Sequence, residues 1–170
     1  GILAVGNGKE NVAVATVDAM MTEDAEVISI YYGADASEEK AEELGVIPKL
    51  VIKGWTVAGF DAELMGYSPK LSSEKLAKQL NLNLKDIDMF EINEAFSSQC
   101  LACQKELGVP DEKLNVNGGG ISLGHPVGAT GSRIVITLMY ELKRRKQRYG
   151  VATLCAGGGM GTTVVIEMCE

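Results

Sequence analysis

Residues 131–168 read GSRIVITLMYELKRRKQRYGVATLCAGGGMGTTVVIEM, and this stretch decides the fold. Its first part predicts a helix over 131–145, because apolar side chains recur there at helical spacing: Ile134, Val135, Leu138, Met139 and Leu142. Two runs rich in β-branched residues follow, over 151–155 and 162–168, and the glycines between them predict an antiparallel strand pair. A helix that leads into paired strands predicts an α/β layer fold.

Predicted strands and helices also alternate along the rest of the chain. Runs rich in Val, Ile or Tyr predict strands at Gly1–Val5, Val27–Tyr32 and Lys49–Val57. Helical patterns cover Lys9–Met21, Ser37–Leu44, Ser72–Leu80 and Glu94–Leu107. Gly150 is expected to end the 131–145 helix. We therefore expect a mixed sheet with helices on its faces and an antiparallel strand pair at the C-terminus.

The composition excludes several classes of protein. The 170 residues carry a net charge of −7, so a nucleic-acid backbone is a poor partner. No apolar run approaches the roughly 20 residues that span a membrane. Residues 1–45 hold ten acids and two lysines, a net charge of −8, whereas residues 46–170 hold thirteen acids and fourteen bases, a net charge of +1. This shift near residue 45 is the only boundary signal.

The cysteines and the basic run have ordinary explanations. Cys100 and Cys103 lie three residues apart on a predicted helix, which favours two buried thiols on one face. They lack a second Cys or His pair, so no metal site is predicted. The bases in 143–148 complement the negative end of the preceding helix. We interpret these bases as the solvated end of the helix; the alternative is that they bind an anionic ligand.

His125 is the only histidine in the chain. It lies between Gly124 and Pro126, immediately before the helix at 131–145. The positive end of a helix favours a neutral imidazole that can accept or donate a proton, and it also suits an oxyanion. A histidine that only caps or packs the helix is the alternative.

Cys155 ends a predicted strand and opens the glycine segment 156–161. Its sulfur is therefore expected at the end of a sheet beside exposed backbone N–H groups, which could stabilise negative charge. A buried core cysteine is the alternative. Neither glycine-rich segment matches the Walker or dinucleotide fingerprints, so phosphate binding is not favoured.

Asn93 precedes a predicted helix, with Glu94 next to it. It is expected to be the N-cap of that helix, with Glu94 in the first turn. The functional alternative is that its amide holds a water or a substrate oxygen.

Four ordered motifs resemble the C-terminal half of a thiolase (acetyl-CoA acetyltransferase), over roughly residues 37–170. They are Asn93-Glu94-Ala95-Phe96, Asn115-Val116-Asn117-Gly118-Gly119-Gly120, Gly124-His125-Pro126-Val127-Gly128-Ala129-Thr130-Gly131 and Cys155-Ala156-Gly157-Gly158-Gly159-Met160-Gly161. The resemblance implies a thiolase-like C-terminal domain that acts on acyl-CoA thioesters, by thiolytic cleavage or Claisen condensation of acetyl-CoA and acetoacetyl-CoA. It also implies a place in fatty acid metabolism, in the cytoplasm.

The resemblance assigns roles residue by residue. His125 would activate the nucleophilic thiol and help to form an oxyanion hole, and Asn93 would hold a water that completes this hole. Cys155 would be the acid/base that moves the α-carbon proton. Phe96, Gly124 and Gly157 would line the substrate pocket. No cofactor is implied beyond coenzyme A, which is part of the substrate.

The nucleophilic cysteine of a thiolase lies in its N-terminal half, and no cysteine of this chain has that context. We therefore expect an incomplete site, which a homo-oligomer or the missing N-terminal half would complete. The alternative is a non-catalytic remnant that at most binds coenzyme A or another protein. The β-ketoacyl synthase branch is not favoured, because its site takes two histidines from this half and the chain has one.

Residues 1–36 do not resemble a thiolase. Residues 1–8 and 22–33 are similar to the C-terminal part of dihydroxyacetone-kinase-like proteins, including the fatty-acid-kinase type. The seam is expected within 37–45, where the charge also shifts. The sequence therefore predicts a fusion of a non-thiolase segment, residues 1–36, with a thiolase C-terminal domain, residues 37–170.

Overall fold

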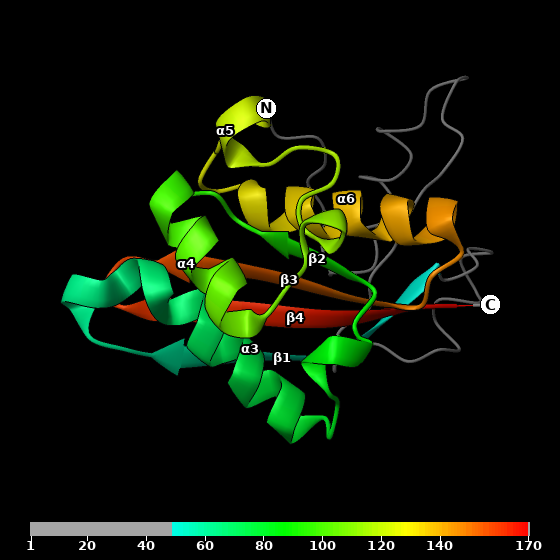
Figure 1. Cartoon of the computed structure of the whole chain (residues 1–170), viewed down its shortest axis with the longest axis horizontal. Coiled ribbons are helices and arrows are strands. Elements are labelled where there is room, and N and C mark those ends of the chain that lie inside the picture. The colour runs from blue at the N-terminus through cyan, green and yellow to red at the C-terminus, as the bar shows by residue number, and fades with distance from the viewer. Residues whose placement is uncertain (1–48, 170) are drawn as a thin grey trace, which may run out of the picture. The chain divides into compact units, whose positions relative to one another are not determined.

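The computed structural model describes residues 49–169, and the elements expected before residue 49 lie outside that range. The strands are β1 (Leu50–Gly59), β2 (Met89–Ile92), β3 (Tyr149–Ala156) and β4 (Met160–Met168) (Figure 1). The α-helices are α3 (Ser68–Gln79), α4 (Ser97–Leu107), α5 (Gly120–Leu123) and α6 (Thr130–Arg145). Three short 3-10 helices are η1 (Ala62–Tyr67), η2 (Leu84–Asp86) and η3 (Asp111–Lys113).

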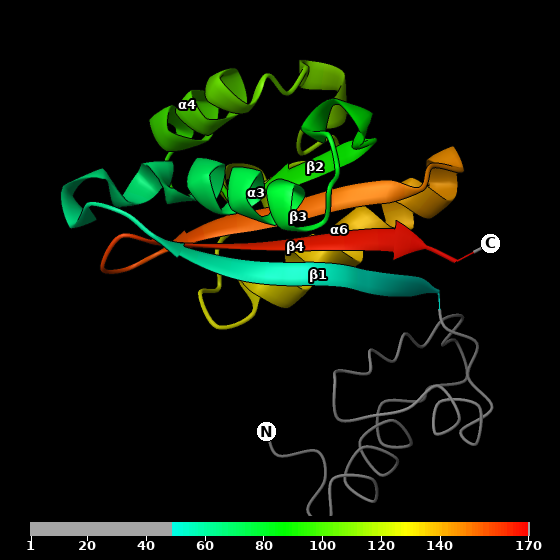
Figure 2. The same ribbon diagram turned by 90° about the horizontal axis from the view of Figure 1, so that it is seen from below.

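The four strands form one mixed sheet in the order β1-β4-β3-β2. β4 pairs antiparallel with both β1 and β3, whereas β2 pairs parallel with β3. Seen along its edge, the sheet has α3 and α4 on one side and α6 on the other (Figure 2). The expected α/β class, with a mixed sheet, helices on its faces and a C-terminal antiparallel strand pair, is confirmed.

Each face of the sheet has its own apolar core, because successive strand residues point to opposite sides. Val151 and Val165 pack with Leu76 of α3, whereas Ala152 and Ile166 pack under α6. The stripe that predicted α6 supplies its buried apolar residues: Ile134, Leu138, Met139 and Leu142. Burial of an aliphatic side chain of this size stabilises the fold by about 2 kcal/mol. The periodicity of α6 therefore fixes it against one face.

The prediction that Gly150 ends α6 is wrong. The helix stops at Lys146, which takes a left-handed backbone conformation with φ of 56°. Gly150 lies within β3 instead. A Cβ atom there would come within 2.7 Å of Leu138 Cγ, so the close packing of α6 on β3 requires glycine.

The predicted start of the 94–107 helix is also wrong, because α4 begins at Ser97. Asn93 is not an N-cap: its backbone N–H donates to Thr153 O at 2.9 Å and continues the pairing of β2 with β3. β2 itself was not predicted, and all four of its residues are buried, Glu91 among them. The helix expected from Ser72 begins four residues earlier, at Ser68. Within residues 49–169, no helix combines the length and apolar character that crossing a membrane requires.

Candidate functional site

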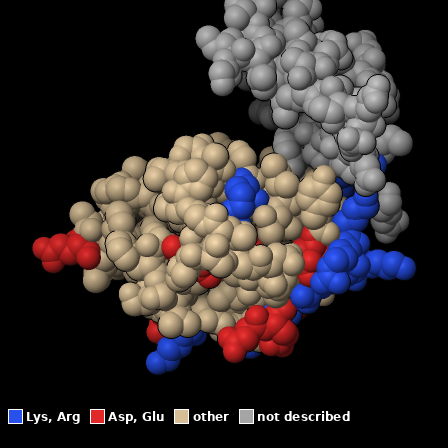
Figure 3. Space-filling view, turned by 90° about the horizontal axis from the view of Figure 1, so that it is seen from above, with Lys and Arg blue, Asp and Glu red and all other residues tan. Residues whose placement is uncertain are grey.

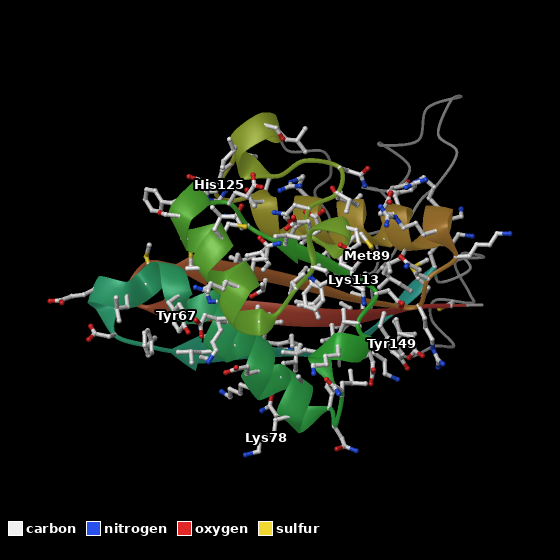
Figure 4. The ribbon with its side chains drawn as sticks, in the orientation of Figure 1. Tyr67, Lys78, Met89, Lys113, His125 and Tyr149 are labelled. Atoms are coloured by element: carbon white, nitrogen blue, oxygen red, sulfur yellow. The ribbon has the colours of Figure 1, made fainter. Side chains whose placement is uncertain are left out.

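The structure brings two of the predicted site residues into contact. Asn93 follows β2 directly and is buried, with 1% of its surface exposed. His125 is exposed and lies in the connection between α5 and α6, at the α5 end of the molecule (Figure 4). The Nδ2 atom of Asn93 lies 3.4 Å from Nε2 of His125. A buried amide therefore meets one nitrogen of an accessible imidazole.

The other imidazole nitrogen is held by the start of α6. His125 Nδ1 lies 2.6 Å from the hydroxyl oxygen of Thr130, the first residue of that helix. Thr130 is 1% exposed, and its hydroxyl also contacts the Pro126 carbonyl oxygen at 3.1 Å. The prediction that His125 immediately precedes a helix N-terminus is confirmed. Sequence reasoning did not single out Thr130, although it belongs to the same motif.

The first glycine-rich segment, residues 118–124, packs on Glu94. A Cβ at Gly119 would overlap the Glu94 carboxyl group, and one at Gly120 would lie 3.3 Å from Asn93 Oδ1. The carboxylate of Glu94 accepts a hydrogen bond from the Ile121 N–H at 2.9 Å. Glu94 is therefore not a first-turn acid of α4, as its place in the sequence suggested. It ties the segment that leads to His125 onto the end of β2.

Asn115 closes the free edge of β2, and sequence reasoning missed this. Its side-chain oxygen accepts from the Ile92 N–H and its side-chain nitrogen donates to the Ile92 carbonyl, both at 2.9 Å. The same nitrogen also donates to Glu94 at 3.2 Å. The amide thus replaces a neighbouring strand at that point. The only signal in the sequence was an asparagine shortly before the glycines at 118–120.

Cys155 lies one residue before the end of β3, as the strand pattern predicted. Ile92 pairs with Thr153 in the parallel register, so Asn93 and Cys155 leave adjacent strands at the same end of the sheet. Cys155 is half-buried, and this burial raises the pKa of its thiol, which therefore keeps its proton at neutral pH. Within residues 49–169, no hydrogen bond joins Cys155 to His125 or Asn93.

The three predicted pocket residues are open to solvent. Phe96 is 62% exposed, at the start of α4. A Cβ atom at Gly124 or Gly157 would meet nothing within 4 Å. Two other glycines of the second segment, residues 157–161, are packed against backbone: a Cβ at Gly159 would overlap the segment that follows β1, and a Cβ at Gly161 would overlap the carbonyl of Ser68 at the start of α3. Of the two glycine-rich segments, only part is therefore available to another molecule.

Cys100 and Cys103 are buried on α4, so the prediction of two core thiols is confirmed. Burial raises the pKa of Cys100 to about 12, and it also raises the pKa of Cys103. Neither supplies a thiolate at neutral pH. In the part of the chain that the structure describes, no group of three or more His, Cys, Asp or Glu side chains could hold a metal ion.

Three of the five bases in 143–148, which lie in the last turn of α6 and just after it, bond to acids of the same chain. Arg144 and Arg145 both bond Glu141, and Arg148 bonds Glu167. The hydrogen bond from Arg144, together with the weaker effect of that from Arg145, lowers the pKa of Glu141 to about 2. This arrangement favours the predicted helix end over an anion site. Glu141 also accepts from Asn117 at 3.0 Å and so reaches the segment that precedes the first glycines.

A buried carboxylate lies beside the site. Glu91 is two residues before Asn93 on β2, with a side chain 4% exposed, and it faces Arg133 of α6 at 3.5 Å. Burial raises the pKa of Glu91 to about 7, although Arg133 opposes this shift. No sequence signal pointed to it, because a charged residue in an apolar run reads as a surface position.

The beginning of the chain is similar to a family other than the thiolases. Residues 1–46 match the family of fatty-acid-kinase-like C-terminal segments. The second resemblance in the sequence is thereby confirmed.

The rest of the chain has close relatives. The 3-ketoacyl-CoA thiolase of Bacillus subtilis is 46% identical over 131 residues, which are 77% of this chain and 34% of that protein. The acetyl-CoA acetyltransferase of Chromobacterium violaceum is 45% identical over 131 residues, which are 77% of this chain and 33% of that protein. The chain thus spans about a third of the length of these relatives.

A solved structure agrees. The crystal structure of the Bacillus anthracis acetyl-CoA acetyltransferase superposes with a TM-score of 0.75 at 49% identity, over 78% of this chain and 34% of that one. Residues 46–168 match the family described as "Thiolase, C-terminal domain". Through this domain, the chain belongs to the thiolase family.

Proposed function

We propose that residues 37–170 are the proton-handling half of an acyl-CoA acyltransferase, acting in thiolytic cleavage or Claisen condensation of acetyl-CoA and acetoacetyl-CoA. The observation that carries the proposal is the 3.4 Å contact between Asn93 Nδ2 and His125 Nε2, at the strand end from which Cys155 also emerges. A thioester α-proton is weakly acidic, so its removal needs a base together with fixed donors for the enolate oxygen. The site has groups suited to both tasks.

His125 has two roles in this proposal: it takes the proton of the nucleophilic thiol, and it helps to form the oxyanion hole. Asn93 holds a water that completes the oxyanion hole, and its Oδ1 atom is suited to this because it is buried and has no hydrogen-bond partner among residues 49–169. Cys155 moves the α-carbon proton, and the raised pKa of its thiol keeps that proton available. Phe96, Gly124 and Gly157 border the thioester.

In this proposal the nucleophile comes from outside these 170 residues. Cys100 and Cys103 are buried, and Cys169 follows β4 at the opposite end of the sheet from Cys155. The surface beside His125 is suited to such a partner: Ile121, Leu123 and Val127 are 65%, 57% and 81% exposed. Figure 3 looks down on this side of the molecule and shows a broad area with few charged side chains. A second copy and the missing thiolase half are the two candidate partners.

The test follows the loss of acetoacetyl-CoA with coenzyme A. The full chain is assayed alone and with a purified fragment of the Bacillus subtilis thiolase that covers the part it does not match. We expect turnover only in the mixture, and a fall of at least about 100-fold for His125→Ala or Cys155→Ala. Cys169→Ala is the matched control and should not change the rate. Turnover by the chain alone would make a second copy the partner.

Absence of turnover in a mixture that forms a complex would establish the competing interpretation, a non-catalytic remnant that binds coenzyme A or another protein. Mass spectrometry after exposure to acetyl-CoA gives a second reading, since acetylation of a cysteine in this chain would contradict a nucleophile supplied from outside.

We also propose that residues 1–36 are a separate segment joined to the thiolase domain within 37–45, and that the protein acts in the cytoplasm in fatty acid metabolism. The matches of residues 1–46 and 46–168 to two different families support a junction, although they meet at residue 46, just after 37–45. Genomic DNA read across the junction tests it: a single continuous reading frame is expected, and an intact upstream thiolase half would contradict it.

A further inference from the structure

His125 can carry its single neutral-state proton on either ring nitrogen, and only one choice leaves Nε2 free to act as a base. We propose that Thr130 is a positioning residue that holds this proton on Nδ1 and so keeps Nε2 as an acceptor. The inference deepens the proposed function and rests on it for its chemical meaning.

The first support is the hydroxyl of Thr130. It has one proton to donate and lone pairs to accept with. Its oxygen lies 3.1 Å from the Pro126 carbonyl oxygen, which can only accept, and 2.6 Å from His125 Nδ1. When the hydroxyl proton points to Pro126, a lone pair faces the ring and Nδ1 must donate. Thr130 is 1% exposed, so bulk water does not compete for either contact.

The second support comes from the opposite side of the ring. The nitrogen of the Asn93 amide, Nδ2, can only donate, and it lies 3.4 Å from His125 Nε2. This contact requires a lone pair on Nε2. Asn93 is held in place by its backbone bond to Thr153 and by the close approach of Gly120 to its Oδ1 atom. Two neighbours from different elements, α6 and the end of β2, are therefore both satisfied by the same tautomer.

The consequence for the proposed reaction is direct. Nε2 takes the proton of an incoming thiol: the S–H bond breaks, the Nε2–H bond forms, and the sulfur keeps the electron pair. Nδ1 keeps its proton and its bond to Thr130 throughout, whereas the Asn93 Nδ2–H must give up its contact with Nε2 when that nitrogen takes the proton, since both groups are then donors. An uncharged hydroxyl thus does the orienting work that a carboxylate does in many catalytic triads.

The test uses the fact that His125 is the only histidine in the chain. A long-range ¹H–¹⁵N correlation spectrum of the ¹⁵N-labelled 170-residue protein, recorded where the ring is neutral, reports one imidazole without assignment by mutation. We expect Nε2 in the unprotonated range and Nδ1 in the protonated range. Thr130→Val should shift the ratio of the two tautomers toward Nε2–H by about fivefold, and Thr130→Ser should restore it.

Thr137→Val is the matched control, because it makes the same change on the same helix and should leave the ratio unaltered. A wild-type spectrum with Nε2 protonated overturns the proposal, since Thr130 would then donate to Nδ1 and the Asn93 amide would be turned. An unchanged ratio in a folded Thr130→Val protein also overturns it. If that variant does not fold, the wild-type spectrum still decides. The measurement needs no substrate, so failure of the proposed acyl transfer is a separate result.

Discussion

The two glycine-rich segments near the site look alike in sequence but are anchored in different ways. In residues 118–124, Gly119 packs against the carboxyl group of Glu94, a side chain that can move. In residues 157–161, Gly159 and Gly161 pack against backbone atoms around Phe60 and Ser68, which cannot move without moving the sheet. The comparison teaches that a glycine cluster beside a site is first of all a packing device, and that what it packs against decides how rigid it is.

The largest expected effect is at the backbone contact. Gly161→Ala places a methyl group on the Ser68 carbonyl, and we expect a loss of about 3 kcal/mol in the free energy of unfolding. Urea denaturation measures it. Gly157→Ala, where a Cβ meets nothing within 4 Å, is the control and should change stability by less than about 0.5 kcal/mol. Equal losses in the two variants would mean that this segment is not anchored at the backbone.

Lowering the pH should destabilise the packing of residues 118–124 before it destabilises that of residues 157–161. Glu141, which holds Asn117 beside the first glycines, has a pKa of about 2 in the folded protein against an ordinary 4.5. Because the folded pKa is the lower one, its contribution is present above pH 4.5 and is lost as the pH falls toward 2. Between pH 5 and pH 3 the loss is about 2 kcal/mol. Unfolding free energies at the two pH values measure this difference.

Glu141→Gln should remove about half of the loss between pH 5 and pH 3, because the hydrogen bond from Lys53 also holds the pKa of Glu167 at about 2 and Glu167 titrates over the same range. Amide exchange gives the local reading: the N–H groups of 117–120 should lose protection at a higher pH than those of 159–161. Simultaneous loss in both segments would show that the acid effect is global and does not distinguish them.

The smallest effect is the coupling between Gly119 and Glu94. Gly119→Ala should be destabilising in the wild type and about 1 kcal/mol less so in a Glu94→Ala background, because the obstructing carboxyl group is gone. A double-mutant cycle by urea denaturation measures the coupling. As the control cycle, the effects of Gly161→Ala and Glu94→Ala on the free energy of unfolding should be additive. Additive behaviour at Gly119 would remove the distinction between the two segments.

The parts of the fold that sequence predicted are those with a long, regular pattern. α6 has an apolar stripe at helical spacing, and β1, β3 and β4 are long runs rich in β-branched residues, so their existence and type were correct. β2 was not predicted because it has only four residues and contains Glu91, whose charge interrupts the apolar run. The start of α4 was misplaced because Asn93 and Glu94 have the composition of a helix cap yet complete a strand and a long-range contact.

The site shows the same division. Motif order identified His125, Asn93 and Cys155, and the structure joins the first two across 32 positions of the chain. Their supporting partners could not be predicted in this way. Asn115 reaches Ile92 over 23 positions, and such hydrogen bonds leave no periodic trace in a sequence. Thr130 was visible in its motif, but nothing in the order of residues indicates which nitrogen of His125 it contacts.

The strand order also has a consequence for how the domain is made. The last strand of the chain, β4, lies between the first described strand, β1, and its neighbour β3. During synthesis, β1 therefore emerges from the ribosome long before its partner β4 exists, and the backbone N–H and C=O groups that pair with β4 have no partner strand until then. The sheet can close only when β4 has been made, so a nascent domain of this kind depends on protection from aggregation until then.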